Sequence, residues 1–421
     1  MYRRNYPGDP GMHNMGDHNT RVDYRSNPGF LTRVGNSLVG IVVGVGLLVV
    51  ASGLLFWNEG RSVQTARSLE EGLSSVVSLE NIDVSFVENN GRLVHLSGPL
   101  KTERVLRDPM YNVAVQCTKL KRQVEMYQWV EHESKREFDE GGETRVETSY
   151  SYSLEWKSTV ERSSSFYNSV GHNNPSTMIV ESIEYKAEAV HVGTFLLSEV
   201  LVDKIADFQT LPPQYVSPLE DTKIKLVDGV FYHSDDPYNP KVGDYKVTFA
   251  YAGLAGDSKL GPAKTVSVIA RQDKDRLVKY TTMAGDDLEL LYQGQMSPKE
   301  IFLKEEATNA FITWGIRFGG WLLMFVGFGC LTSIITTLVD WIPLVRNLVA
   351  AGVMMMNAVF AISLSLTVIA LGWIRYRPWL GISILVLAVT PFIISKFKKP
   401  RPSNREPYNY NDSYSRDRFY D

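Results

Sequence analysis

The sequence predicts a multi-pass α-helical membrane protein with four transmembrane helices, one N-terminal and three C-terminal, and a large β-rich α+β lumenal domain between helices one and two. Three observations support this fold class. Long runs of the 421-residue chain carry no charge. One run lies near the start and three crowd the end, and the polar residues between them alternate as strands do. The uncharged runs are 38–56, 318–339, 347–374 and 378–395.

Each uncharged run meets or nearly meets the length of a membrane span. A helix rises about 1.5 Å per residue, so about 20 apolar residues cross a hydrocarbon core of roughly 30 Å. The first run follows a mostly polar stretch and ends without a small-residue cleavage site, which favours a retained anchor over a cleaved signal peptide. We therefore expect transmembrane helices at 34–57, 317–339, 346–374 and 378–395, with disordered tails at 1–33 and 396–421.

Basic residues beside the spans predict the orientation, because Lys and Arg stay on the cytoplasmic side. Both flanks are basic, with Arg21, Arg25 and Arg33 before the first span and a Lys/Arg cluster within 396–405 after the fourth. Only Arg375 and Arg377 favour the opposite orientation. We expect both termini in the cytosol or nucleoplasm and residues 58–316 in the lumen.

Composition narrows the class of function. The net charge of −3 does not indicate nucleic-acid binding. Cys117 lies in the middle domain and Cys330 in the second uncharged run, so no disulfide framework is predicted. Pumps and channels usually keep charged residues inside their spans, and the uncharged runs 38–56, 318–339, 347–374 and 378–395 hold none, which disfavours transport. Asn357 is expected to hydrogen-bond between helices.

Small residues mark two candidate helix-packing faces. Gly40 and Gly44 are four residues apart on the first span, and Gly315 and Gly319 are four apart where the second begins. Such pairs let helix backbones approach closely. The alternative interpretation is that glycine is simply common in membrane helices.

The middle domain is predicted to be mostly antiparallel sheet. Residues 146–160 alternate almost strictly between apolar and polar, 119–136 can alternate too, and Asp-Glu-Gly-Gly at 139–142 predicts the hairpin turn between them. A short helix is expected at 199–208. Further strands are expected at 92–96, 177–183, 190–196, 224–227, 230–233, 245–251, 265–271, 277–281 and 288–292.

Amphipathic helices are predicted at both ends of this domain. Apolar residues recur at helical spacing over 63–77, and Ser297-Pro298-Lys299-Glu300 forms a capping box with proline at the first helical position. We expect both helices to lie against the bilayer and clamp the domain to it. The alternative is that their apolar faces pack on the domain's own core.

No pattern predicts catalysis, a metal or a cofactor. The chain has no G-x-S-x-G or H-E-x-x-H motif and no phosphate-binding glycine loop. Asp235 and Asp236 stand beside two prolines and are expected to stabilise a turn. The middle-domain histidines have no ligand spacing: His95, His132, His172, His191 and His233. We therefore expect a protein that is not an enzyme.

The sequence resembles the LUMA family, also called the transmembrane protein 43 family, from about Pro28 to the fourth span. The opening signature Asn58-Glu59-Gly60-Arg61 carries the resemblance together with other motifs. These include Gly91-Arg92-Leu93-Val94-His95, Gly171-His172, Phe231-Tyr232-His233-Ser234, Leu260-Gly261-Pro262-Ala263 and Leu338-Val339-Asp340-Trp341.

The resemblance implies a non-enzymatic membrane scaffold of the endoplasmic reticulum and inner nuclear membrane. It implies that the protein organises membrane protein complexes and supports nuclear envelope structure, with other membrane proteins, lamins and emerin-like proteins as partners and with self-association. The Asn58–Arg61 signature lies at the membrane edge, where we expect it to cap and orient a helix after the first span; a partner contact is the alternative. The alternative function is a lumenal ligand- or lipid-binding domain with a signalling or enzymatic output.

Overall fold

The computed structural model describes residues 18–374, apart from 28, 141–142, 221–222 and 339–342, together with isolated positions between 379 and 393. The chain divides into two compact units, each described by itself. The β-rich unit comprises Met1–Arg33 and Arg61–Ile312. The helical unit comprises Val34–Gly60 and Thr313–Asp421.

Three helices in the described part of the chain are long and apolar enough to cross a membrane. They are α1 (Phe30–Ser75), α3 (Pro298–Leu338) and α4 (Pro343–Ile374). At 46 and 41 residues, α1 and α3 are about twice as long as a bilayer core is thick, because each residue adds about 1.5 Å. The fourth predicted span, 378–395, lies mostly outside the described residues, and the tail 396–421 lies wholly outside them.

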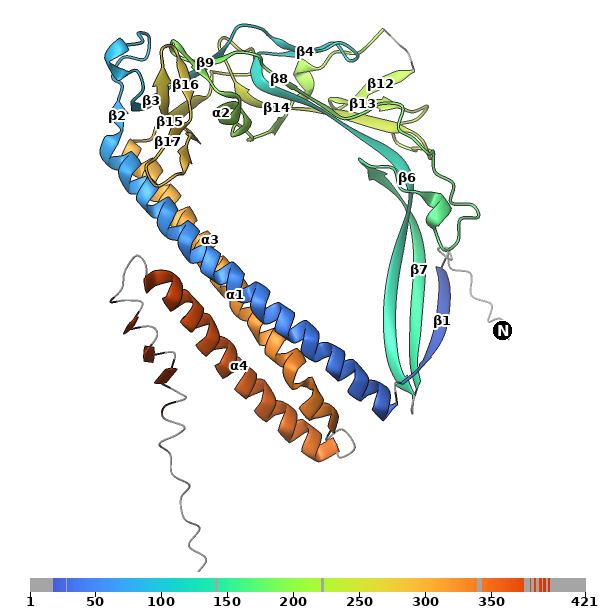
Figure 1. Ribbon diagram of the computed structural model, residues 1–421. Helices are drawn as coiled ribbons and strands as arrows, with labels where there is room; N and C mark the ends of the chain where they lie inside the picture. The colour runs from blue at the N-terminus through green and yellow to red at the C-terminus, as the bar shows by residue number, and fades with distance from the viewer. Residues whose placement is uncertain are drawn as a thin grey trace, which may run out of the picture. The chain divides into compact units, whose positions relative to one another are not determined.

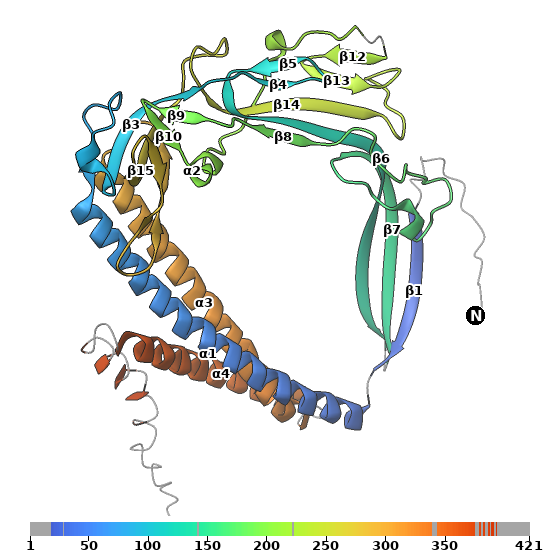
Figure 2. The ribbon, with the colours of Figure 1, turned by 45° about the horizontal axis from the view of Figure 1, so that its top comes forward.

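Within the helical unit, α1 and α3 run side by side in opposite directions (Figures 1 and 2). At one end, the hydroxyl oxygens of Ser37 and Thr337 are 3.0 Å apart. At the other, Asn58 Nδ2 donates to the Thr313 carbonyl oxygen at 3.3 Å. One buried apolar cluster of this unit comprises Ala51, Leu55, Met324 and Ala361.

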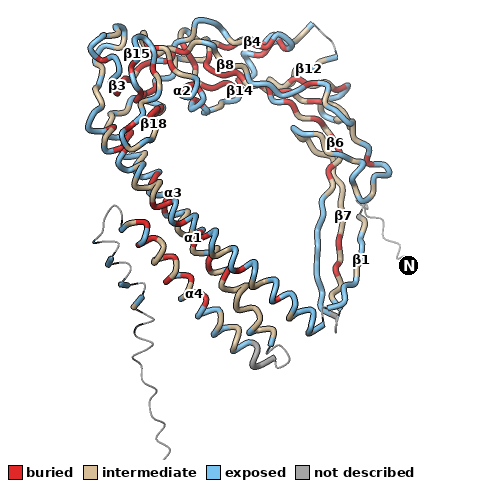
Figure 3. The backbone as a smooth tube through the Cα atoms, viewed as in Figure 1, coloured by how far each residue is buried: buried red, intermediate tan, exposed pale blue. Residues whose placement is uncertain are grey.

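The larger sheet of the β-rich unit is built on a long hairpin, as the alternation and the Asp-Glu-Gly-Gly turn predict. Strands β6 (Cys117–Glu140) and β7 (Glu143–Lys157) pair antiparallel, and Figure 2 shows them extending away from β14, with β1 beside β7. Residues 132–139 of β6 are all exposed (Figure 3). The other strands are β1 (His18–Ser26), β14 (Tyr245–Leu254), β13 (Val230–His233), β12 (Ile224–Val227), β11 (Gln209–Thr210) and β8 (Ile183–Lys186).

The second sheet closes on itself. Five of its strands, β3, β9, β10, β16 and β15, pair in turn, and β15 pairs again with β3. Side chains such as Val94, Phe195 and Val268 belong to one buried cluster of this unit. The strands are β2 (Val77–Ser78), β3 (Leu93–Thr102), β9 (Val190–Val192), β10 (Phe195–Leu197), β15 (Thr265–Asp273), β16 (Arg276–Val278) and β19 (Leu290–Gln293).

Short elements complete the β-rich unit. The helix predicted at 199–208 forms only as α2 (Glu199–Asp203), capped by Ser198, whose side chain accepts from the Leu201 backbone N–H. Two small sheets pair β4 (Leu106–Asp108) with β5 (Val113–Val115) and β17 (Tyr280–Thr281) with β18 (Asp287–Leu288).

Two sequence-based expectations are wrong. Residues 1–33 are not wholly disordered, because His18–Ser26 forms β1 and pairs with β7. Residues 177–182 form no strand, and β8 starts at Ile183. The described sheets are mostly antiparallel, as predicted, with the exceptions that β10 pairs parallel with β16 and β2 with β3.

Part of each predicted amphipathic segment packs on the β-rich unit. The two segments are not separate helices but extensions of α1 and α3. Leu69 of α1 and Ile301 and Phe302 of α3 join one buried cluster with strand residues such as Leu290. The capping box is confirmed, because the Ser297 backbone N–H donates to Glu300 Oε2 at 2.8 Å. Packing on the domain core is therefore the correct alternative for these three side chains.

Candidate functional site

The candidate site is built on Glu59, whose side chain is completely buried in the helical unit. Its Oε1 accepts a hydrogen bond from Arg317 Nε at 2.7 Å, and its Oε2 accepts one from Arg317 Nη2 at 2.6 Å. Trp373 Nε1 also donates to Oε2. These residues come from α1, α3 and α4, so a single carboxylate joins all three helices. Bidentate Arg–carboxylate pairs combine strength with fixed geometry.

The surroundings fit this ion pair closely. The Arg317 guanidinium lies 4.9 Å from the centre of the Trp314 ring and 5.6 Å from that of Trp373, at distances typical of cation–π contacts. A Cβ added at Gly372 would stand 2.9 Å from Cβ of Glu59. Any larger residue at 372 would therefore push α4 away from α1 at the level of the carboxylate.

The rest of the Asn58–Arg61 signature contacts α3 or faces open space. Asn58 is fully buried and bonds the Thr313 carbonyl, as described above. An added Cβ at Gly60 would meet nothing within 4 Å. In the β-rich unit, Arg61 Nη1 donates to Asn309 Oδ1 at 3.1 Å. The expected capping role is wrong, because α1 runs unbroken through all four residues.

The arrangement favours a static connection over ion or proton movement. Both Glu59 oxygens are engaged, and the opposite charge of Arg317 is in direct contact. A relay needs a carboxylate that changes partners. Removing one member of a buried ion pair leaves the other charge uncompensated, which costs several kcal/mol. The cluster therefore acts as a fixed structural connection between α1, α3 and α4.

The glycine candidates differ in their surroundings. An added Cβ at Gly44 would stand 2.7 Å from the Gly327 carbonyl oxygen, and one at Gly40 would make ordinary contacts at 3.5 Å with Cys330 and Ser333. At Gly315 and Gly319 an added Cβ would meet nothing within 4 Å. The helices therefore approach closely at two places, where Gly44 meets Gly327 and where Gly320 meets Leu55, since an added Cβ at Gly320 would stand 2.5 Å from Leu55.

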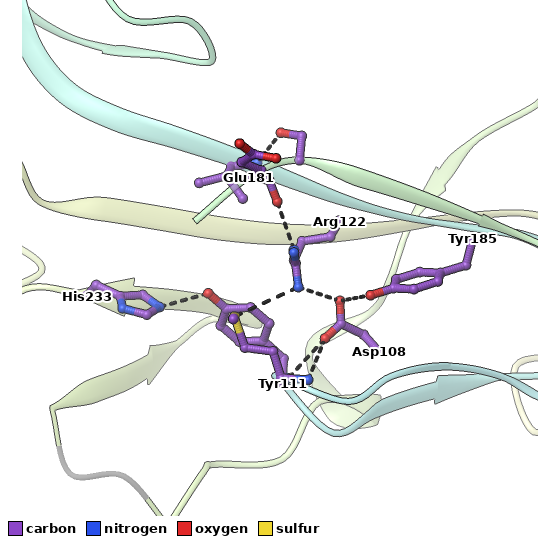
Figure 4. A network of polar contacts seen from close by, with 9 residues as sticks. Asp108, Tyr111, Arg122, Glu181, Tyr185 and His233 are labelled. Carbon is purple, nitrogen blue, oxygen red and sulfur yellow. Dashed lines mark hydrogen bonds and ion pairs between the residues drawn. The ribbon is translucent and has the colours of Figure 1, made fainter. Parts of the chain in front are cut away.

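A second polar network lies in the β-rich unit (Figure 4). Asp108, at the end of β4, is completely buried, and its Oδ2 accepts from Arg122 Nη1 at 2.9 Å and from the Tyr185 hydroxyl at 3.2 Å. Its Oδ1 accepts from the Tyr111 backbone N–H at 3.1 Å, and the Tyr111 hydroxyl lies 2.8 Å from His233 Nε2. The network thus connects β4, β6, β8 and β13 through one buried ion pair.

Next to this network is a cavity of about 420 Å³ between residues 103–107 and 184–189. Tyr185 lines it while bonding Asp108, so the network supports one wall. Acidic and basic side chains both line the cavity, including Glu103, Arg104, Arg107 and Glu184. Its volume falls in the range of small-molecule sites.

Two buried titratable groups of the β-rich unit are kept in their neutral form. Burial raises the pKa of Tyr111 and that of the Cys117 thiol to about 12, so neither ionises near neutral pH. Within the described ranges, no group of three or more His, Cys, Asp or Glu side chains is placed to hold a metal. Three histidines illustrate the dispersal, since His95 contacts Met296, His132 contacts Glu155 and His172 stacks on Tyr152.

The sequence analysis missed Arg317, Trp373 and Gly372 as partners of Glu59. A signal for them was present. In helices that alternate in direction, the end of the first apolar run, the start of the second and the end of the third share one membrane face. Glu59, Arg317 and Trp373 stand at those three positions.

The comparisons with known proteins agree with the predicted resemblance. The family model described as Transmembrane protein 43 matches residues 126–378. The human Transmembrane protein 43 is 45% identical over 383 residues, which cover 90% of this chain and 95% of the relative. The Transmembrane protein 43 homolog of Drosophila melanogaster is 36% identical and covers 83% of this chain and 92% of the relative. No solved structure matches. This chain therefore belongs to the transmembrane protein 43 family.

Proposed function

We propose that this protein is a non-enzymatic scaffold of the endoplasmic reticulum and inner nuclear membrane, which organises membrane protein complexes and supports the nuclear envelope. The observation that carries the proposal is the Glu59–Arg317–Trp373 cluster. The charges of Glu59 and Arg317 neutralise each other inside the helical unit. This favours a rigid structural support over a path for ions or protons. Family resemblance adds lamins, emerin-like proteins and further copies of the chain as proposed partners.

The proposed topology has both tails in the cytosol or nucleoplasm and the β-rich domain in the lumen. The basic residues that flank the spans support it. The pairing of β1 with β7 competes with it, because β1 precedes the first apolar run and β7 follows it. A run that crosses a sealed bilayer would leave the two strands on opposite sides.

Comparing the free energy of inserting the first apolar run into the membrane with that of pairing β1 with β7 favours a first span that crosses the bilayer. The run 38–56 contains 13 Leu, Ile, Val and Phe residues, and at about 0.3–0.6 kcal/mol each their insertion contributes about 4–8 kcal/mol. β1 is a nine-residue edge strand, and the side chains of residues 19–26 are mostly exposed. A net gain of about 1 kcal/mol per hydrogen bond is offset by about 1–2 kcal/mol of backbone entropy per residue. We therefore propose that β1 separates from β7 when α1 is inserted.

A cross-linking experiment tests the topology. Val22 and Glu147 face each other across β1 and β7, so the variant Val22→Cys/Glu147→Cys reports their pairing. In sealed microsomes we expect no disulfide between these positions, and added protease should trim the tails and spare the domain. A disulfide in closed vesicles, or digestion of the domain, would overturn the topology.

Proximity labelling tests the scaffold. A biotin ligase fused to either terminus of the full chain should label membrane proteins of the reticulum and nuclear envelope, with emerin-like proteins and lamins among them. Glu59→Leu should reduce this labelling, whereas Glu70→Gln, an exposed change on the same helix, should leave it unchanged. Recovery of no such proteins by the unmodified chain would refute the proposal.

The cavity between residues 103–107 and 184–189 favours a second candidate function, binding of a small ligand by the lumenal domain. Ala187 lines the cavity, so Ala187→Trp should fill part of it. Native mass spectrometry of the purified full chain should then show a bound molecule that this variant loses. An identical spectrum for both proteins would count against ligand binding.

A further inference from the structure

A groove of about 560 Å³ lies on the helical unit and is lined by α1, α3 and α4. Its walls include the small residues Gly40, Gly329 and Ala350, and no charged side chain lines it. The groove lies within the uncharged runs, so lipid is the surrounding solvent. Its volume is that of a small-molecule site, and its small residues leave smooth walls.

One polar side chain in the groove has an unmet requirement. Asn357 of α4 lines the groove and is only 4% exposed. Its Nδ2 donates to Thr332 Oγ1 at 2.8 Å, whereas its Oδ1 has no hydrogen-bond partner in the described structure. A buried polar atom without a partner costs free energy, and in hydrocarbon no water compensates for it.

The neighbouring hydroxyl fixes which amide atom is unpaired. Thr332 Oγ1 already donates its hydrogen to the Phe328 carbonyl oxygen at 2.8 Å, so towards Asn357 it can only accept. The amide nitrogen therefore faces Thr332, and the oxygen is the atom left over. Ser333 and Thr336 likewise donate to carbonyl oxygens of their own helix, at 2.8 Å each. Asn357 Oδ1 is thus the buried polar atom of the described groove lining that still requires a hydrogen-bond donor.

We propose that this groove binds a membrane sterol, whose one hydroxyl donates to Asn357 Oδ1 and whose rigid apolar body lies against Gly40, Gly329 and Ala350. A sterol combines one donor with a flat apolar ring system, which matches one acceptor on smooth uncharged walls. The terminal torsion of Asn is broad, so a small rotation turns the buried oxygen towards the groove. This site is independent of the Glu59 cluster and of the proposed scaffold role.

Photolabelling of the full chain in sterol-containing vesicles tests the proposal. The probe is a photoreactive sterol with an alkyne tag, and mass spectrometry locates the label. Gly329→Leu should block the groove without a clash, since an added Cβ there meets nothing within 4 Å. Gly319→Leu is the matched control on the same helix, because its Cβ is equally free and 319 does not line the groove.

We expect label on groove residues that Gly329→Leu lowers at least fivefold and Gly319→Leu leaves unchanged. Asn357→Leu, which keeps the side-chain size and removes the acceptor, should lower it between about two- and tenfold, as the loss of one hydrogen bond predicts. An analogue with a ketone in place of the hydroxyl should compete poorly.

Four results would overturn the proposal. The label could be insensitive to Gly329→Leu, or the ketone analogue could compete as well as the sterol. Cross-links from the groove to residues 378–395 of the same chain would identify the fourth predicted span as its occupant. Cross-links between two chains through the groove would identify a second copy.

Discussion

Replacing one member of the Glu59–Arg317 pair is predicted to destabilise the helical unit far more than replacing both residues together. Glu59→Leu leaves a guanidinium in an apolar interior, and Arg317→Leu leaves a carboxylate whose side chain is fully buried. Breaking a buried ion pair by removing one partner costs about 3–5 kcal/mol. Arg317 retains 14% exposure and can reach water, so we expect about 3 kcal/mol for Glu59→Leu and about 5 kcal/mol for Arg317→Leu.

The double variant distinguishes pairing from packing. Replacing a buried ion pair with apolar residues of similar volume is often neutral or stabilising. Glu59→Leu/Arg317→Leu should therefore cost less than about 1 kcal/mol. The indole N–H of Trp373, which loses its acceptor in this variant, adds its own cost to that figure. The free energy of unfolding is measured by denaturant titration of the full chain in detergent, followed by tryptophan fluorescence. Glu70→Gln, on the exposed face of α1, serves as the control and should stay within about 0.5 kcal/mol of the unmodified protein.

The outcome that would refute this reasoning is additivity. If the free energy of unfolding of the double variant falls by the sum of the two single losses, the two residues stabilise the unit independently and do not act as a pair. The same conclusion follows if both single variants resemble the Glu70→Gln control.

Three further predictions use the same titration. Gly44→Val should cost about 1–3 kcal/mol through overpacking, because its Cβ would stand 2.7 Å from a backbone oxygen, whereas Gly319→Val should cost little; equal losses would contradict the packing role. Asp108→Ala should cost about 3–5 kcal/mol by leaving Arg122 buried and unpaired, and a loss below about 1 kcal/mol would show that solvent reaches it. Burial lowers the pKa of His95 below its ordinary 6.5, so the stability that neutral His95 contributes is present above pH 6.5 and is lost as pH falls through the lowered value. His95→Gln should flatten the pH dependence between pH 7 and 5, and an unchanged slope would assign it to other groups.

The local pattern of the sequence predicted many of the elements. The hairpin β6–β7 follows from period-two alternation and a glycine turn, and strands such as β12 and β13 have the predicted bounds. Residues 177–182 were misjudged because their apolar residues suggested a strand, yet the chain there forms no ladder. Short apolar runs do not distinguish a strand from buried irregular backbone.

The sequence identified one part of the candidate site, on the first helix, and not the residues of the other two helices. The signature that carries the family resemblance identified Glu59 and its buried neighbour Asn58. Its partner Arg317 lies 258 residues away in sequence, and Trp373 lies further still. Local periodicity carries no information about which helix faces which at that distance.

The sequence by itself determined that this chain enters a membrane and carries a β-rich domain between its spans, since apolar length and alternation are local properties with large transfer free energies behind them. Only the tertiary structure decided that Glu59 is neutralised inside the helical unit, that Gly327 rather than Gly315 meets the glycine face of α1, and that Asn357 has an unpaired oxygen. These outcomes depend on how helix faces rotate against one another. Close packing sets that rotation over many side chains at once, so no single segment of sequence encodes it.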